Sequence, residues 1–161
     1  MPKAYIMLGR IACGKSYIAA ELQKKNGGVI LSCDDLIQAV FDECLGDKLA
    51  ATEEKAIDYL LGLAQQIGKG GTDVIIDCGL FSAELRKRVD SRLRLFGFET
   101  RRILVKSPDD VRHNRLNRRN LQRAGSRKKA YILPWEKVLQ IEERRYEEPR
   151  REEYDQLIEN N

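Results

Sequence analysis

The chain has 161 residues, of which 42% are hydrophobic and 34% charged, and its formal net charge is +4. This length fits a single globular domain, 1–161, with a core of its own, and the chain has neither repeats nor a low-complexity tract. Its apolar runs, such as residues 4–8, are far too short to cross a membrane, and residues 1–8 lack the features of a signal peptide. We therefore expect a cytoplasmic protein with no membrane partner.

Short apolar segments typical of buried strands alternate with segments that carry apolar residues at helical spacing. The predicted strands cover residues 4–8, 29–32, 73–77 and 101–106. The predicted helices cover residues 16–25, about 35–45, 52–67, 82–96, a segment that starts at 107–110, and about 135–146. This alternation predicts an α/β domain, in which right-handed helical crossovers join the strands of a mostly parallel sheet of four to five strands.

Two helix starts carry clear capping signals. Ser82 is the expected N-cap of the helix that follows it. The segment "SPDD" (107–110) offers a capping serine, a proline at the first helical position and two acids near the positive helix end. The later segment 121–131 is polar and basic, and we expect a mobile loop there.

The sequence "GRIACGKS" (9–16) directly follows the first predicted strand and precedes a helix. Glycines at this spacing let the backbone turn so that its N–H groups surround a phosphate, and the helix N-terminus adds its positive dipole. Lys15 can then reach the outer phosphates of a nucleotide, and the Ser16 hydroxyl can bind Mg²⁺. The predicted phosphate-binding residues are Gly9, Arg10, Ile11, Ala12, Cys13, Gly14, Lys15, Ser16 and Tyr17.

Acidic residues follow two other predicted strands, at the same edge of the sheet as this loop. Asp34 and Asp35 come directly after the second strand, and Asp77 ends the third. Asp77 can hold Mg²⁺ together with Ser16, and Asp34 can accept a proton from an attacking hydroxyl. The structural alternatives are that Asp34 caps the next helix and that Asp77 begins a turn.

A basic segment follows the fourth strand: residues 111–135 contain no acidic residue. Arg115 and Arg119 are four residues apart and share one helix face, from which they can stabilise the charge of a phosphoryl group in transfer. Arg118 projects elsewhere, and we expect it near the adenine or in solvent. His113, the single histidine, is expected to be an exposed helical residue rather than a catalyst.

The motifs "GRIACGKS", "LSCDD", "VIID" and "NRLNRR", in this order, resemble those of small P-loop kinases related to polynucleotide kinase, zeta toxins and chloramphenicol phosphotransferase. The resemblance covers most of the chain. It implies a three-layer P-loop NTPase fold with an arginine-bearing lid helix over about 109–131, and ATP and Mg²⁺ as cofactors.

The same resemblance implies a role for individual residues. Asp34 corresponds to the general base, and Arg115 and Arg119 correspond to the lid arginines. Lys15 and Ser16 correspond to the phosphate and Mg²⁺ ligands. The residues alone leave open whether Asp34 or its neighbour is the base.

The sequence also departs from the polynucleotide kinase pattern. Ala12 replaces a glycine in the loop, and we expect phosphate binding to survive if this position is not at positive φ. Cys33 replaces the arginine that precedes the acid pair. Ile37 replaces an arginine that helps to hold the nucleic acid, which makes a small acceptor more plausible than a polynucleotide.

Three of the four cysteines, Cys13, Cys33 and Cys78, adjoin proposed site residues. Their simplest role is that of small, mildly apolar residues in tight places. The alternative is an oxidation-sensitive site, because a phosphate-binding helix N-terminus lowers the pKa of a thiol.

The sequence thus predicts an ATP- and Mg²⁺-dependent kinase that phosphorylates a hydroxyl of a small molecule or nucleotide-like acceptor. The alternatives are a polynucleotide 5′-hydroxyl kinase and an ATP-binding regulatory switch with slow hydrolysis and no acceptor. We expect the acceptor pocket to be lined by the loop after Asp77 and by the segment 41–52, with polar contacts from Asp42, Glu43, Asp47 and Lys48.

Overall fold

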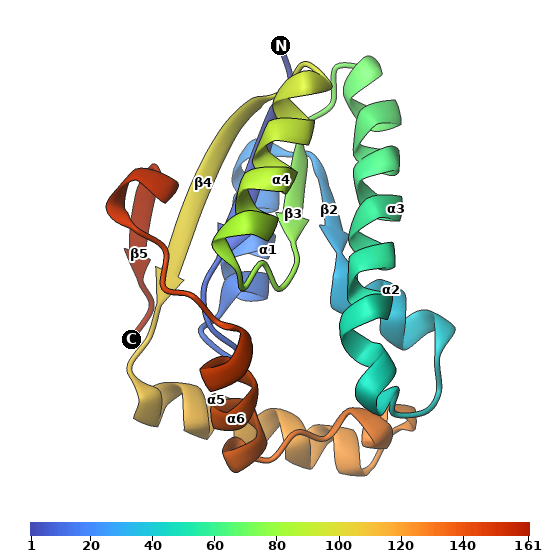
Figure 1. Cartoon of the computed structure of the whole chain (residues 1–161), viewed down its shortest axis with the longest axis vertical. Coiled ribbons are helices and arrows are strands. Elements are labelled where there is room, and N and C mark those ends of the chain that lie inside the picture. Colours follow the sequence, from blue (N-terminus) through green and yellow to red (C-terminus); the bar gives the residue numbers. More distant parts are fainter.

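The computed structural model describes residues 1–161 and contains one five-stranded parallel sheet (Figure 1). The order of its strands is β2-β3-β1-β4-β5, and every neighbouring pair is parallel. The carboxyl ends of the strands therefore lie at one edge of the sheet. The strands are β1 (Lys3–Leu8), β2 (Val29–Ser32), β3 (Val74–Asp77), β4 (Glu99–Lys106) and β5 (Gln156–Glu159).

Six α-helices and three short 3₁₀-helices connect the strands. The α-helices are α1 (Lys15–Asn26), α2 (Cys33–Val40), α3 (Leu49–Lys69), α4 (Ala83–Leu95), α5 (Asp109–Ala124) and α6 (Trp135–Arg145). The 3₁₀-helices are η1 (Gly46–Lys48), η2 (Arg127–Tyr131) and η3 (Arg151–Glu153). None of the helices is both long and apolar enough to cross a membrane.

The core has two parts, one on each face of the sheet. On one face, Ile6 of β1 and Ile76 of β3 belong to a cluster with buried residues of α3 and α4. On the other face, the neighbouring strand residues Met7 and Ile75 belong to a cluster with Ala19 of α1. Because successive strand residues point to opposite faces, the apolar runs of β1 and β3 supply both clusters and create a three-layer α/β domain.

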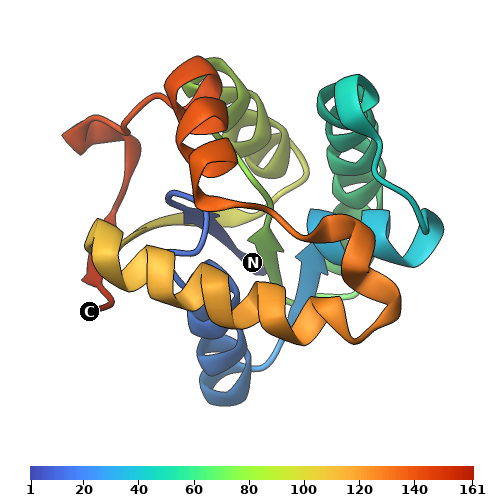
Figure 2. The ribbon, with the colours of Figure 1, turned by 90° about the horizontal axis from the view of Figure 1, so that it is seen from below.

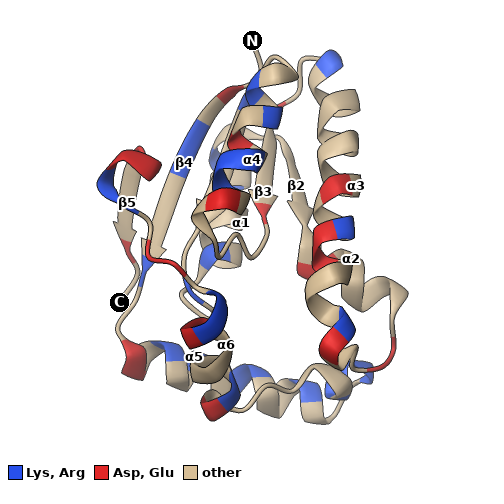
Figure 3. Ribbon diagram, viewed as in Figure 1, with Lys and Arg blue, Asp and Glu red and all other residues tan.

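Helix α5 lies outside these layers and crosses the carboxyl ends of the strands, as Figure 2 shows from below. Basic residues recur along it (Figure 3). This confirms the expected α/β P-loop fold, in which an arginine-bearing helix covers the edge where the strands end.

The structure differs from the predicted elements in three places. The fifth strand that the prediction allowed is β5, but its position was not predicted, because its residues are mostly exposed and form no long apolar run. The expected mobile loop at 121–131 is instead helical, since α5 continues to Ala124 and η2 follows. Asn120 fixes this region by exchanging two hydrogen bonds with the backbone of Leu133, at 2.7 and 3.1 Å.

The third difference concerns two helix boundaries. Helix α5 begins after Pro108, because the Ser107 hydroxyl does not cap it and instead donates to the carbonyls of Cys13 and Asn160. Helix α2 ends at Val40, earlier than predicted, because the backbone becomes extended at Phe41.

Candidate nucleotide-binding and catalytic site

The loop between β1 and α1 has the left-handed backbone turns that the glycine spacing predicts. Gly9 has φ +145° and Gly14 has φ +97°. Ala12 also lies at positive φ (+62°), so the condition under which we expected an alanine to fit without strain is not met. A side chain in this conformation costs about 1–2 kcal/mol. The loop of this protein therefore carries local strain that a glycine at position 12 would remove.

Lys15 and Ser16 lie at the start of α1, where the dipole favours an anion. The Lys15 ammonium folds back over the loop and donates to the carbonyls of Gly9 and Arg10, both at 3.0 Å. The Ser16 hydroxyl donates to Oδ2 of Asp77 at 2.7 Å, from the end of β3. Burial raises the pKa of Asp77, and the Ser16 hydrogen bond and the charge of Lys15 oppose this rise. The two predicted oxygen ligands of Mg²⁺ are thus in direct contact.

Asp34 lies in the first turn of α2, directly after β2. It does not cap the helix, because Ser32 takes that role and accepts a hydrogen bond from the Asp35 amide at 3.1 Å. Asp34 lines the central cavity of the domain, and Asp35 does not. Of the two acids, Asp34 is therefore the one that a molecule inside the cavity can reach.

Three arginines on one face of α5 line the same cavity: Arg115, Arg119 and Arg123. Arg115 is held by the Cys13 carbonyl at 3.2 Å and the Ser107 hydroxyl at 2.8 Å. The Nε of Arg119 is buried without a hydrogen-bond partner, which suits a donor to a bound anion. Burial, together with the neighbouring Arg123, lowers the pKa of Arg119.

Two other residues of α5 behave differently. Arg118 is exposed, in agreement with its position on another helix face. His113 is half-buried rather than exposed, because its ring stacks on Trp135 with 4.9 Å between the ring centres.

A buried ion pair connects the loop to both helices that lie over it. The Nη2 of Arg112 donates to both carboxylate oxygens of Glu142 at 2.6 Å, and the two side chains are 1% and 3% exposed. The pair also holds both polar groups of Ile11: its N–H donates to Glu142 at 3.0 Å, and its carbonyl accepts from Arg112 at 3.0 Å. Arg112 is therefore a positioning residue for the loop and not a phosphate ligand.

The segment after β5 also contacts the loop. The Asn160 amide donates to the Cys13 carbonyl at 3.2 Å, and the Asn160 carbonyl accepts from Arg115 at 2.9 Å. A Cβ on Gly14 would lie only 2.1 Å from the Asn160 amide nitrogen. Gly14 is thus required mainly by its positive φ, since the Asn160 side chain can move to admit a Cβ.

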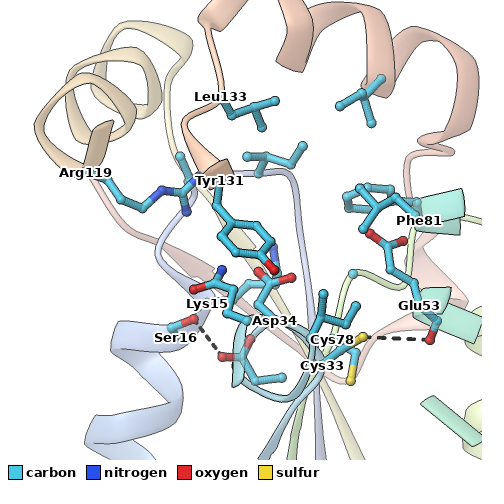
Figure 4. A pocket seen from close by; sticks show the side chains of 18 of the residues that line it. Lys15, Ser16, Cys33, Asp34, Glu53, Cys78, Phe81, Arg119, Tyr131 and Leu133 are labelled. Atoms are coloured by element: carbon cyan, nitrogen blue, oxygen red, sulfur yellow. Dashed lines mark hydrogen bonds between the residues drawn. The ribbon is translucent and has the colours of Figure 1, made fainter. Parts of the chain in front are cut away.

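The loop, Asp34, Asp77 and the arginine face of α5 enclose one cavity of about 370 Å³, and 15 of its 27 lining residues are hydrophobic. Figure 4 shows Ser16, Lys15 and Arg119 on one side of Asp34, and Cys33, Cys78 and Glu53 on the other. Asp34 lies between these two sides of the cavity, which we name the phosphate side and the acceptor side after the roles that we propose for them.

Some predicted residues lie outside this cavity. Gly9 and Cys13 belong to the turn but do not line the cavity, and Tyr17 is 62% exposed. Arg10 does not line the cavity, and its guanidinium contacts Glu142 at 3.4 Å. The expected polar contacts from the segment 41–52 are wrong, because its charged residues are exposed and outside the cavity: Asp42, Glu43, Asp47 and Lys48.

The acceptor side contains residues that the sequence did not single out. Glu53 of α3 and Arg145 of α6 form an ion pair at 2.8 Å on the cavity wall. Burial raises the pKa of Glu53, although the hydrogen bond from Arg145 opposes this. Their contact joins residues 92 positions apart, and no local pattern indicates it.

Cys13, Cys33 and Cys78 are all buried. A hydrogen bond with Cys33, together with burial, raises the pKa of Cys78 well above its ordinary value. This disfavours the reactive thiolate at Cys78 and supports the simpler role of a small apolar residue there.

Comparison with known proteins agrees with this fold. The model of a family described as an AAA domain matches residues 5–149. No curated protein matched the sequence. A solved structure from Chloroflexus aurantiacus is similar over 98% of this chain and 86% of its own, with 21% identity and a TM-score of 0.77.

Two solved kinase-related structures are also similar. The APS kinase CysC of Mycobacterium tuberculosis, in complex with AMPPNP and APS, shares 17% identity over 98% of this chain and 88% of its own, with a TM-score of 0.69. A chain of the Pnkp1/Rnl/Hen1 RNA repair complex shares 19% identity over 88% of this chain and 43% of its own, with a TM-score of 0.70. On the family match, the chain belongs to this AAA-domain family, and it has the fold of the P-loop kinases.

Proposed function

We propose that this protein is an ATP-dependent kinase that transfers the γ-phosphoryl group to a hydroxyl of a small molecule. One observation carries the proposal: Lys15, Asp34 and the arginine face of α5 all line the same cavity. A donor nucleotide on the loop and an acceptor beyond Asp34 would then meet inside one enclosed space, from which α5 helps to exclude water.

The roles follow from the positions of these side chains. Lys15 leaves the loop carbonyls to bind the outer phosphates, and Arg119 stabilises the charge that develops on the group in transfer. Asp34 accepts the proton of the acceptor hydroxyl. The acceptor oxygen forms a bond to the γ-phosphorus as the bond from that phosphorus to the bridging oxygen breaks, and ADP leaves.

The donor set also fits a Mg²⁺ ion. Ser16 and Asp77 offer a hydroxyl and a carboxylate, 2.7 Å apart, and hard oxygen ligands of this kind are those that Mg²⁺ prefers. These two residues would hold the ion, which supplies neutralisation of the phosphate charge when it is bound.

The contacts and the volume of the cavity favour a small acceptor over a polynucleotide. The Tyr131 hydroxyl donates to the Phe41 carbonyl, which connects η2 to the chain after α2. The whole cavity, which the donor phosphates would share, has a volume of about 370 Å³, within the range of small-molecule sites.

The experiment is an ATP-consumption screen with metabolites, nucleosides, antibiotics and 5′-hydroxyl oligonucleotides. For the acceptor found, Asp34→Asn should lower the rate of transfer by about 10²–10⁴-fold while ATP affinity is retained. The matched control is Asp35→Asn, which changes an acid outside the cavity and should leave the rate within a few-fold of the wild type. Equal rates for wild type and Asp34→Asn would contradict the role of Asp34.

A further inference from the structure

We propose that the acceptor is an apolar alcohol with a carboxylate at the end distant from its reacting hydroxyl, and that Arg145 binds this carboxylate. The inference rests on the kinase function proposed above and assigns its substrate class. It comes from the chemistry of the cavity on the acceptor side of Asp34.

The wall of the acceptor side is mainly aliphatic and aromatic. Side chains from α2, α3, α6, the segment between α2 and α3, and the loop after β3 form it: Ile37, Leu45, Leu49, Ile57, Phe81 and Ile141. Contact with this wall stabilises the apolar part of a bound molecule by about 25 cal/mol for each Å² of apolar surface removed from water. Hydroxyl groups pressed against it would instead lose their hydrogen bonds to water without replacement.

The polar groups of this side mostly bond within the protein. The Tyr131 hydroxyl donates to a backbone carbonyl, and so do the thiols of Cys33 and Cys78. The guanidinium of Arg123 donates to the Tyr131 carbonyl at 2.6 Å. A sugar, which has a hydroxyl on nearly every carbon, would find few free partners here. This argues against a polyol acceptor.

Arg145 keeps donors beside this apolar wall, because its guanidinium makes a single hydrogen bond. Its Nη2 donates to Glu53 at 2.8 Å, and its guanidinium lies 5.4 Å from the ring centre of Phe81. These two contacts orient the guanidinium, while its other N–H groups make no hydrogen bond within the protein. An oriented guanidinium with free N–H groups on an apolar wall matches the planar, two-oxygen geometry of a carboxylate.

Glu53 is less suited to be the anchor. One of its oxygens already accepts a hydrogen bond from Arg145. Burial raises the pKa of Glu53, and the charge of Asp34 adds to the rise, so this environment disfavours the ionised carboxylate. Asp34, Glu53 and Arg145 line the same cavity. A hydroxyl at Asp34 and a carboxylate at Arg145 can therefore belong to one compact molecule.

The test uses 4-(hydroxymethyl)benzoate and 6-hydroxyhexanoate, each compared with the alcohol that lacks the carboxylate, and glucose as the polyol. Acceptor-dependent ADP release and calorimetric binding in the presence of AMPPNP are both measured. We expect each hydroxy acid to bind and react at least about 10-fold better than its matched alcohol. Glucose should neither bind nor react.

Arg145→Gln should abolish this preference by raising KM for the hydroxy acid about 10-fold or more, without changing the affinity for AMPPNP. The matched control is Arg144→Gln, an exposed neighbour that does not line the cavity. The proposal is overturned if the hydroxy acids neither bind nor react, or if the preference survives Arg145→Gln. Failure of the kinase function is distinguishable, because AMPPNP would then bind while no hydroxyl compound of any class is phosphorylated.

Discussion

The substitution Glu142→Gln tests the ion pair that holds the phosphate-binding loop. It keeps the shape of the side chain and a partner for the Ile11 amide, but it removes the negative charge opposite Arg112. The guanidinium of Arg112 is 1% exposed and would become a buried charge without compensation. Its remaining acidic partner, Asp109 at 2.8 Å, is 74% exposed, so solvent screens most of its charge.

Breaking a buried pair in this way costs about 3–5 kcal/mol, and the residual contact to Asp109 favours the lower end, about 3 kcal/mol. For a chain of this length, this corresponds to a fall in Tm of about 6–12 °C. Urea unfolding followed by circular dichroism measures the change, and Glu143→Gln, an exposed neighbour, should stay within about 0.5 kcal/mol of the wild type.

A double-mutant cycle attributes the loss to the pair. Arg112→Met removes the uncompensated charge, so Arg112→Met with Glu142→Gln should be less destabilised than the sum of the two single variants by about 2 kcal/mol. A Glu142→Gln protein that loses less than about 1 kcal/mol, or additive single effects, would refute the reasoning.

Three further predictions follow from other parts of the structure. Ala12→Gly should raise the free energy of unfolding by about 0.5 kcal/mol, since relief of the left-handed strain exceeds the entropic cost of glycine; a loss in urea unfolding would contradict it. Arg119→Ala should lower the rate of phosphoryl transfer at least about 100-fold, while Arg118→Ala should not; equal rates would exclude Arg119 from catalysis. The hydrogen bond from Arg102 lowers the pKa of Asp155 from 3.8 to about 2, so this carboxylate stabilises the fold above its unfolded pKa and loses the effect as the pH falls from about 4 towards 2. Because the pair is partly exposed, Asp155→Asn should lower the free energy of unfolding by less than about 1 kcal/mol at pH 7, and by still less at pH 3. A loss of stability that grows on acidification would be inconsistent with the pair.

The turn between β1 and α1 could be predicted because its signals are local. The spacing of Gly9, Gly14, Lys15 and Ser16 fixes a turn between a strand and a helix, and the apolar strands are short and regular. The position of Asp77 beside this loop could also be predicted, because parallel topology brings the carboxyl ends of the strands together.

The residues that were missed act through long-range contacts. Glu142 reaches Ile11 across 131 positions, and Arg145 reaches Glu53 across 92. Asn160 contacts Cys13 across 147 positions, and it follows directly after the edge strand β5, which has no clear apolar pattern. Charged residues of this kind look like solvated surface positions in the sequence, because their burial depends on helices that pack together only in the folded domain.

The boundary errors have a related cause. The N-terminus of α5 and the carbonyls of Cys13 and Asn160 compete for the Ser107 hydroxyl. Tertiary contacts decide this competition in favour of the carbonyls. The same applies to Ala12, whose left-handed backbone is imposed by its neighbours in the loop and is not a preference of alanine.

The central claim is transfer of the γ-phosphoryl group to a hydroxyl with Asp34 as the base. Its most direct test is a single-turnover reaction with ATP labelled in its γ-phosphate, with the acceptor present, for wild type and Asp34→Asn. The account predicts that the label appears in a phosphate monoester of the acceptor, about 10²–10⁴-fold more slowly in the variant. Label released only as inorganic phosphate, at equal rates in both proteins, would contradict it.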